Sequence, residues 1–297
     1  MNDVIRWNDQ FYILASSSLT DGRTEVLKQG ETFAVFDRYG DIHAVLPGPQ
    51  GLYHEGTRFL SRFELLLGSQ RPMLLSASVK EDNTLFTVDL TNPDLILDQQ
   101  RLVPRGTLHV CRTRFLWQGT CHERIRMHNY GATELCAYLR IAMDADFADL
   151  FEARGRQRPC RGCRLETTHT EKALILAYEG LDRTVRRTHI RCSPAPNQVT
   201  ADGFLIEGLL PPHTEMTWDL SVTCEIMPQR ELVVMSYDHA HHEAATALQD
   251  SKVQEAHIYT ANEQFNHWFN RSVADLHMLI SETPQGLYPY AGVPWFS

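Results

Sequence analysis

The sequence lacks both a long apolar run and a leader-like start. Its first residues, MNDVIRWNDQFYILA, contain neither a basic region nor a sustained hydrophobic segment, and no stretch of the chain approaches the about 20 apolar residues that span a bilayer. Low-complexity segments and internal repeats, which mark disordered and solenoid proteins, are also missing. We therefore expect a globular, cytoplasmic protein that has no membrane partner.

Positive charge is scarce as well. The chain has 28 Lys and Arg residues against 37 Asp and Glu residues, a formal net charge of −9. Nucleic acids and anionic membranes both bind positively charged surfaces. This balance disfavours either of them as the main partner, and a neutral ligand is easier to accommodate.

Cysteine is too sparse to staple the fold. Seven cysteines, an odd number, are scattered over 297 residues. A chain of this length can bury a sufficient core without disulfides. We expect reduced thiols, several of which act as small apolar residues on strands.

What the sequence does contain is period-two alternation of apolar and polar residues, which is typical of half-buried strands. FAVFDRYGDIHAV (33–45) predicts a hairpin around the turn RYGD, and alternation over 121–128 and 135–143 predicts a second hairpin around HNYG. The cleanest strand spans 216–224. Shorter strands are predicted at 85–90, 108–117, 173–178, 185–192 and 203–209. So many strands without alternating helices indicate a mainly β fold, a large antiparallel β-sandwich (super-sandwich) over residues 1–236.

The periodicity becomes helical after residue 236, so residues 237–297 form a second unit of C-terminal linker helices. Its clearest helix spans 262–280, with Thr260 and Glu263 as a capping box and Ser281, Pro284 and Gly286 as the stop. Its aromatic stripe needs a partner surface, either the sandwich or another domain.

Four carboxylates in DADFADLFE could carry chemistry: Asp144, Asp146, Asp149 and Glu152. Hydrolysis of a glycosidic bond needs two carboxyl groups about 5–9.5 Å apart. The alternative is a polar turn at the end of a strand, which we favour because spacing alone does not separate the two.

The segment RGRQRPCRGCR (154–164) combines five arginines with a Cys-x-x-Cys pair, Cys160 and Cys163. A structural zinc site would need a second pair of ligands, and a thioredoxin-like centre would need a βαβ context. Neither is evident, so we favour an exposed basic loop whose arginines pair with nearby acids.

A metal hypothesis also arises in YDHAHHEAA. His239 and Glu243 are four residues apart, as are Asp238 and His242, so each pair could share a helix face and bind a divalent ion. No third ligand is specified. We favour a solvated first turn with Asp238 near the helix N-terminus.

The stretch GLYHEGTRFLSRFELLL (51–67) mixes charged and aromatic residues densely. They are Tyr53, His54, Glu55, Arg58, Phe59, Arg62 and Phe63. Alternation places Phe59 and Phe63 on one face, opposite the two arginines. We favour structural packing around a buried ion pair over contact with a ligand or a neighbouring domain.

The aromatic ending GLYPYAGVPWFS offers a different kind of site. Tyr288, Tyr290, Trp295 and Phe296 are residue types on which sugar rings stack. The alternative is an aromatic loop that packs against another part of the protein.

Four stretches carry a resemblance to a known family. GLYHEGTRFLSRFELLL, DNTLFTVDLTNPDL (82–95), DFADLFEARG (146–155) and PYAGVPWFS (289–297) resemble, in this order, the N-terminal part of the bacterial glycogen-debranching, amylo-α-1,6-glucosidase-like family. The resemblance extends from residue 21 to residue 297.

The resemblance implies a two-part enzyme, in which a sandwich precedes an α/α toroid that carries the catalytic carboxylates. In such proteins VPWFS runs into a Gly-Arg-Asp-Gly segment that opens the toroid. We therefore expect this chain to be a non-catalytic part of an α-glucan debranching hydrolase, inactive alone, with no catalytic residue, cofactor or metal of its own. Its partner would be an α-glucan, and Trp295 and Phe296 would be substrate contacts.

Two other hypotheses stay open. The chain could be a stand-alone carbohydrate-binding or interaction module, or DADFADLFE could be a hydrolytic site in its own right. An uncovered aromatic stripe on the 262–280 helix would also favour a homo-oligomer.

Overall fold

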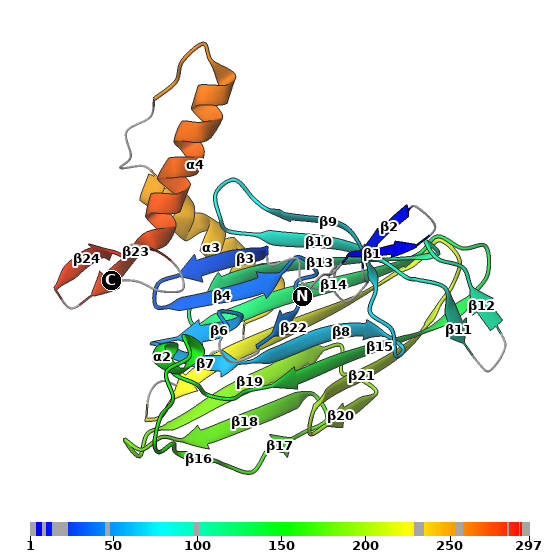
Figure 1. The fold of residues 1–297 in the computed structure, drawn as a ribbon, viewed down its shortest axis with the longest axis horizontal. Helices are drawn as coiled ribbons and strands as arrows, with labels where there is room; N and C mark the ends of the chain where they lie inside the picture. Colours follow the sequence, from blue (N-terminus) through cyan, green and yellow to red (C-terminus); the bar gives the residue numbers. More distant parts are fainter. Residues whose placement is uncertain are drawn as a thin grey trace.

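The computed structural model describes residues 4–7, 10–13, 23–44, 48–97, 101–228, 235–252, 258–283, 285–290 and 292. The described chain is mainly β, and antiparallel sheets pack around one core with helices gathered at one end (Figure 1). The expected sandwich followed by helices is confirmed. No helix in this part of the chain has both the length and the apolar character needed to cross a membrane.

The larger layer, which we call the large sheet, contains nine strands among the described residues. Its order is β16-β18-β19-β22-β14-β13-β10-β9, and β17 also pairs with β18. The bounds are β9 (Met73–Val79), β10 (Phe86–Thr91), β13 (Leu108–Trp117), β14 (Thr120–Asn129), β16 (Cys163–Arg164), β17 (Thr168–His169), β18 (Ala173–Glu179), β19 (Val185–Ser193) and β22 (Glu215–Ile226).

The opposite layer consists of two sheets. The small sheet has the order β20-β21-β15-β8-β5, and the flanking sheet has the order β3-β4-β6-β7. Their bounds are β3 (Thr24–Gln29), β4 (Thr32–Asp37), β5 (Ile42–His43), β6 (Gly51–His54), β7 (Thr57–Leu60), β8 (Arg62–Leu67), β15 (Leu135–Asp144), β20 (Gln198–Thr200) and β21 (Gly203–Leu210).

Separate hairpins and helices complete the fold. The hairpins are β1 (Val4–Trp7) with β2 (Gln10–Ile13), β11 (Leu95–Leu97) with β12 (Arg101–Val103), and β23 (Ile280–Thr283) with β24 (Gly286–Pro289). The helices are α2 (Leu150–Ala153), α3 (Tyr237–Lys252) and α4 (Glu263–Leu279). The helical region thus begins where the sequence predicts it, and a domain boundary at residue 236 stays a prediction.

Alternation along the strands builds the core between the layers. On β22, Trp218, Leu220, Val222 and Cys224 are buried and the residues between them are not. Residues of both layers form one apolar cluster. The apolar face of each sheet is thus removed from water by packing against the other layer. All the strands predicted from the shorter runs are present within a few residues of their expected ends.

The first predicted hairpin is wrong in its pairing. The turn at 38–41 forms, with Asp37 accepting hydrogen bonds from the backbone of Tyr39 and Asp41. However, β4 pairs with β3 and β6, whereas β5 pairs with β8 in the small sheet. Alternation shows which face of a strand is buried, but it does not name the neighbouring strand.

The second predicted hairpin is wrong for the same reason. Strands β14 and β15 lie in opposite layers, and the turn between them carries the chain across the core. Asn129, which is fully buried, directs this crossing because its amide donates to the carbonyls of Thr133 and Leu210 and its oxygen accepts from Gly131. The true hairpin partner of β14 is β13.

The cap predicted for the last helix is also corrected. Asn262, not Thr260, is the N-cap of α4, and its side chain accepts from the backbone of Phe265. Thr260 instead bonds the side chain of the buried Asn266. A capping box needs the cap three residues before Glu263, but the helix begins at Glu263 itself.

A buried charge network joins the layers. Glu123 on β14 accepts from Arg112 Nε at 2.7 Å and from Arg114 Nη2 at 2.8 Å, and all three side chains are almost fully buried. Arg112 also donates to Asp41 at 2.6 Å, in the turn that separates β4 from β5. Burial raises the pKa of Asp41, but Arg112 and the groups around it bring the pKa down to about 2.

Gly40 allows this network to reach the turn. Its carbonyl accepts from Arg114 Nη1, its φ is +75°, and a Cβ there would lie 2.9 Å from Arg114 Nη1. The turn therefore needs glycine both for its backbone conformation and for this close approach.

We predict that Glu123→Ala destabilises the fold by about 3–5 kcal/mol, because it leaves two buried arginines without their shared carboxylate. Urea denaturation measures this loss. Arg140→Ala, which removes an exposed ion pair with Asp202, is the matched control and costs less than about 1 kcal/mol. Equal effects of the two substitutions would contradict a structural role for the network.

Candidate functional site

The carboxylates of DADFADLFE are all occupied by arginines. Arg58 is fully buried and forms a two-point ion pair with Asp146, at 3.0 Å through Nε and 2.5 Å through Nη2. The other pairs are Asp144 with Arg164, Asp149 with Arg158, and Glu152 with Arg161. Asp149 and Glu152 also form the capping box of α2. Because a guanidinium holds each carboxylate, this geometry favours the polar turn over a hydrolytic pair, which needs carboxyls free to give and take a proton.

Arg58 accounts for the mixture of charged and aromatic residues in the stretch 51–67. Besides Asp146, it donates to the carbonyl of Gln50 at 3.1 Å and to the hydroxyl of Tyr53 at 3.3 Å. Phe59 and Phe63 lie in the core on the opposite face, as the alternation predicts. The interpretation as packing around a buried ion pair is confirmed.

The arginine-rich segment reaches back to these acids as a loop over residues 154–162, and its last two residues, Cys163–Arg164, form β16. Three of its arginines make the ion pairs with Asp144, Asp149 and Glu152. Cys160 and Cys163 are exposed free thiols. The loop interpretation is therefore confirmed.

The acids of α3 have partners of their own. Glu243 accepts from the indole of Trp117 at 3.0 Å and pairs with His239 at 3.2 Å, and Asp238 pairs with Arg124 at 2.8 Å. These contacts attach α3 to the large sheet, which favours a structural role over metal binding.

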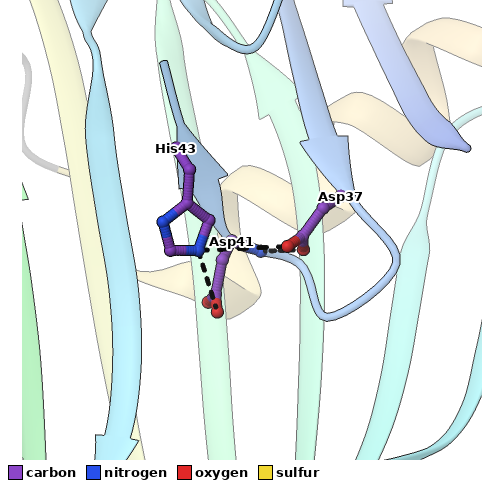
Figure 2. Close-up of side chains that lie close together, drawn as sticks. All are labelled: Asp37, Asp41 and His43. Carbon is purple, nitrogen blue, oxygen red and sulfur yellow. Dashed lines mark hydrogen bonds and ion pairs between the residues drawn. The ribbon is translucent and has the colours of Figure 1, made fainter. Parts of the chain in front are cut away.

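One group with metal-like spacing was missed by the sequence analysis. Figure 2 shows Asp37, Asp41 and His43 around the 38–41 turn, with His43 Nε2 4.0 Å and 3.9 Å from the two carboxylates. Arg71 pairs with both aspartates, and Arg112 pairs with Asp41. The Asp41 carboxylate raises the pKa of His43. Guanidinium groups thus already supply the positive charge that a metal would bring.

We predict that this cluster does not take up a metal in the native chain. Adding Mn²⁺ or Zn²⁺, or adding EDTA, should leave the melting temperature unchanged, because a ligand that binds only the folded state would raise it. Arg71→Ala, which removes the competing cation, is the comparison in which a metal-dependent rise is expected. A metal-dependent rise in the unaltered chain would contradict the assignment.

A groove lined by polar side chains lies elsewhere, on the face of the large sheet that is turned away from the core. A cavity of about 390 Å³ lies at the end of this sheet, where the turns 30–31, 55–56 and 118–119 converge, and a cavity of about 560 Å³ adjoins Tyr237. Both are lined by His122, His189, Arg191, Ser221 and Met235, and we call the two cavities together the outer groove. Their sizes are typical of small-molecule sites.

Strand register sets the floor of the outer groove. His122 on β14 lies opposite Ser221 on β22, which lies opposite Arg191 on β19. In the next row, Thr223 lies between Thr120 and His189. These residues occupy the polar alternate positions of the strands 120–129, 185–193 and 215–226. That alternation was the sequence signal that could have indicated them.

The histidines of the groove have different surroundings. His122 is 4% exposed and stacks on Phe115, with ring centroids 4.9 Å apart. Burial lowers the pKa of His122 to about 4, so its ring is neutral at pH 7. His189 Nε2 lies 2.9 Å from Glu225 Oε2.

The predicted sugar contacts Trp295 and Phe296 lie outside the described residues, so their role stays a prediction. Tyr288 and Tyr290, from the same aromatic stretch, pack edge to face with ring centroids 5.3 Å apart. Tyr288 is exposed on β24.

We predict a loss of stability below pH 6.5 that arises from His122. The unfolded chain binds a proton near pH 6.5 and the folded chain only near pH 4, so stability falls as the pH drops through this window, by on the order of 3 kcal/mol. His122→Phe should remove this part of the pH dependence. Urea denaturation at several pH values measures it, and an unchanged dependence in the variant would contradict the assignment.

The fold is that of an antiparallel β-sandwich with a polar groove on its outer face and trailing helices. The chain belongs to the family described as the N-terminal domain of some glycogen debranching enzymes, whose sequence model matches residues 27–222. A comparison with curated proteins finds no match.

The solved structures that the chain matches are only distantly similar to it. A candidate kojibiose phosphorylase from the human microbiome has a TM-score of 0.45 and 10% identity over 86% of this chain, which covers 36% of that protein. A candidate aldose 1-epimerase from Escherichia coli K12 has a TM-score of 0.36 and 11% identity, over 68% of this chain and 99% of that one. These similarities are too weak to carry a conclusion about function.

Proposed function

We propose that this chain is the non-catalytic N-terminal domain of a cytoplasmic α-glucan debranching glycoside hydrolase. It supports a helical catalytic domain and helps to shape the substrate entrance. Membership of the family supports this proposal. So does the pairing of every carboxylate of DADFADLFE with an arginine, which leaves that segment without a free acid and base.

The observation that carries the proposal is the uncovered apolar side of α4. Figure 1 shows α4 projecting from the sandwich, and Phe265, Trp268 and Leu276 are 44%, 68% and 59% exposed. Exposed apolar patches of this kind mark interaction surfaces. A helical domain that packs against α4 would cover these side chains.

The C-terminal part of the helix is nevertheless held in place. Asn83 donates to Asp275 at 2.7 Å, and Lys28 donates to Ser281, just after the helix, at 2.7 Å. Because α4 is attached to the sandwich while Phe265, Trp268 and Leu276 stay exposed, it is suited to present a fixed docking surface.

We predict that Phe265→Ser with Trp268→Ser weakens binding to the separately supplied catalytic domain of a glycogen debranching enzyme at least tenfold, because it removes apolar area from the interface. Calorimetry measures the affinity. Gln264→Ser, an exposed polar position on the same helix, is the control and leaves it unchanged.

The chain alone should release no glucose from a branched α-glucan. Turnover by the isolated chain at about 1 per second or faster, a typical enzyme rate, would overturn the non-catalytic assignment. Docking that is insensitive to the paired α4 substitution would overturn the role of α4.

A stand-alone carbohydrate-binding or interaction module is the second candidate, favoured by the exposed aromatic Tyr288 beside Tyr290. In that case Trp295→Ala would abolish maltooligosaccharide binding. The apolar side of α4 would then be covered by a second copy of the chain, and sedimentation would show a dimer.

A further inference from the structure

The outer groove contains a polar side chain whose ring nitrogens have no hydrogen-bond partner among the described residues. His122 is 4% exposed, lines both cavities, and makes no hydrogen bond to a described residue through either ring nitrogen. These nitrogens are not among the buried atoms that lack a partner, so they are accessible from the cavities. Its position on the cavity wall makes a bound ligand the natural partner.

The residues next to His122 add further polar groups to the same surface. Ser221 and Arg191 follow it in the same row across β22 and β19. Within the described ranges, the guanidinium of Arg191 makes no hydrogen bond or ion pair. The row therefore offers hydrogen-bond donors and acceptors to one ligand.

The charges around the groove favour a neutral ligand. The charged lining residues are Glu31, Glu55 and Glu225 in one cavity, Lys172 and Asp219 in the other, and Arg191 in both. An anion would meet the carboxylates, and a cation would meet Arg191 and Lys172. A hydroxyl both donates and accepts, so it matches carboxylates, cations and a neutral imidazole together.

An aromatic wall completes the site. Trp117 lines the cavity of about 390 Å³, and its Nε1 donates to Glu243 at 3.0 Å, which fixes the orientation of the ring. The apolar face of a sugar ring packs well against such a surface.

We propose that the outer groove binds a neutral hexose or short oligosaccharide, whose hydroxyls bond His122, Ser221 and Arg191 and whose ring packs against Trp117. This site is separate from the docking side of α4. Only the choice of an α-glucan as the sugar rests on the proposed function.

The test is calorimetric titration of the 297-residue chain with maltotriose, with cellobiose and inorganic phosphate as comparison ligands. We expect maltotriose to bind with a Kd below about 1 mM. His122→Phe keeps the stacking on Phe115 but removes both ring nitrogens, and it should weaken binding at least tenfold. Arg191→Met, at an exposed position, should do the same.

His128→Phe is the matched control, because His128 lies on the same strand and the same face but outside both cavities. It should leave the affinity unchanged. The paired α4 substitution should also leave it unchanged, which separates this test from the docking test.

Each outcome decides a point. Maltotriose binding that is lost in His122→Phe and Arg191→Met but kept in His128→Phe supports the proposal. Binding of cellobiose alone with the same sensitivity supports the site but overturns the α-glucan assignment. Binding of phosphate alone, no binding of either sugar, or sugar binding that both groove variants retain overturns the site.

Discussion

The structure depends on a charge network that is buried between its layers. Glu123 holds Arg112 and Arg114 on the large sheet, and Arg112 reaches across to Asp41. Because Asp41 lies in the turn at 38–41, the network fixes the point where the chain leaves the flanking sheet for the small sheet. Such a network stabilises one arrangement only when its partners are all present, since an unpaired charge in the core is costly.

That arrangement also forms one end of the outer groove. The turns of the flanking sheet contribute Glu31 and Glu55 to the cavity wall, and the β13–β14 turn contributes Gln118. The packing that buries the core of the sandwich therefore brings these hairpin turns together. The groove results from the way in which the two layers pack together.

The polar residues fall into two groups, those in arginine–carboxylate pairs and those without such a partner. The pairs made by Arg58, Arg158 and Arg161 satisfy acids that look catalytic in the sequence, and these pairs fasten the turn and loop after β15. His122 and Arg191 remain without such partners among the described residues. A polar group that is bonded within the fold stabilises the structure, whereas a polar group without such a partner can bind a ligand.

Local alternation predicted many of the strands and the last helix, because it records which face of each element is buried, but it missed strands such as β3 and β9 and the hairpin β23–β24. The strands at 108–117 and 216–224 and the helical region after 236 follow from that pattern, and the four family-like stretches indicated the family. The strand partners of β5 and β15, the ion pair between Arg58 and Asp146, and the row of His122, Ser221 and Arg191 follow from the folded structure alone. These contacts join residues far apart in the chain, and no local pattern encodes which distant residue will be the neighbour.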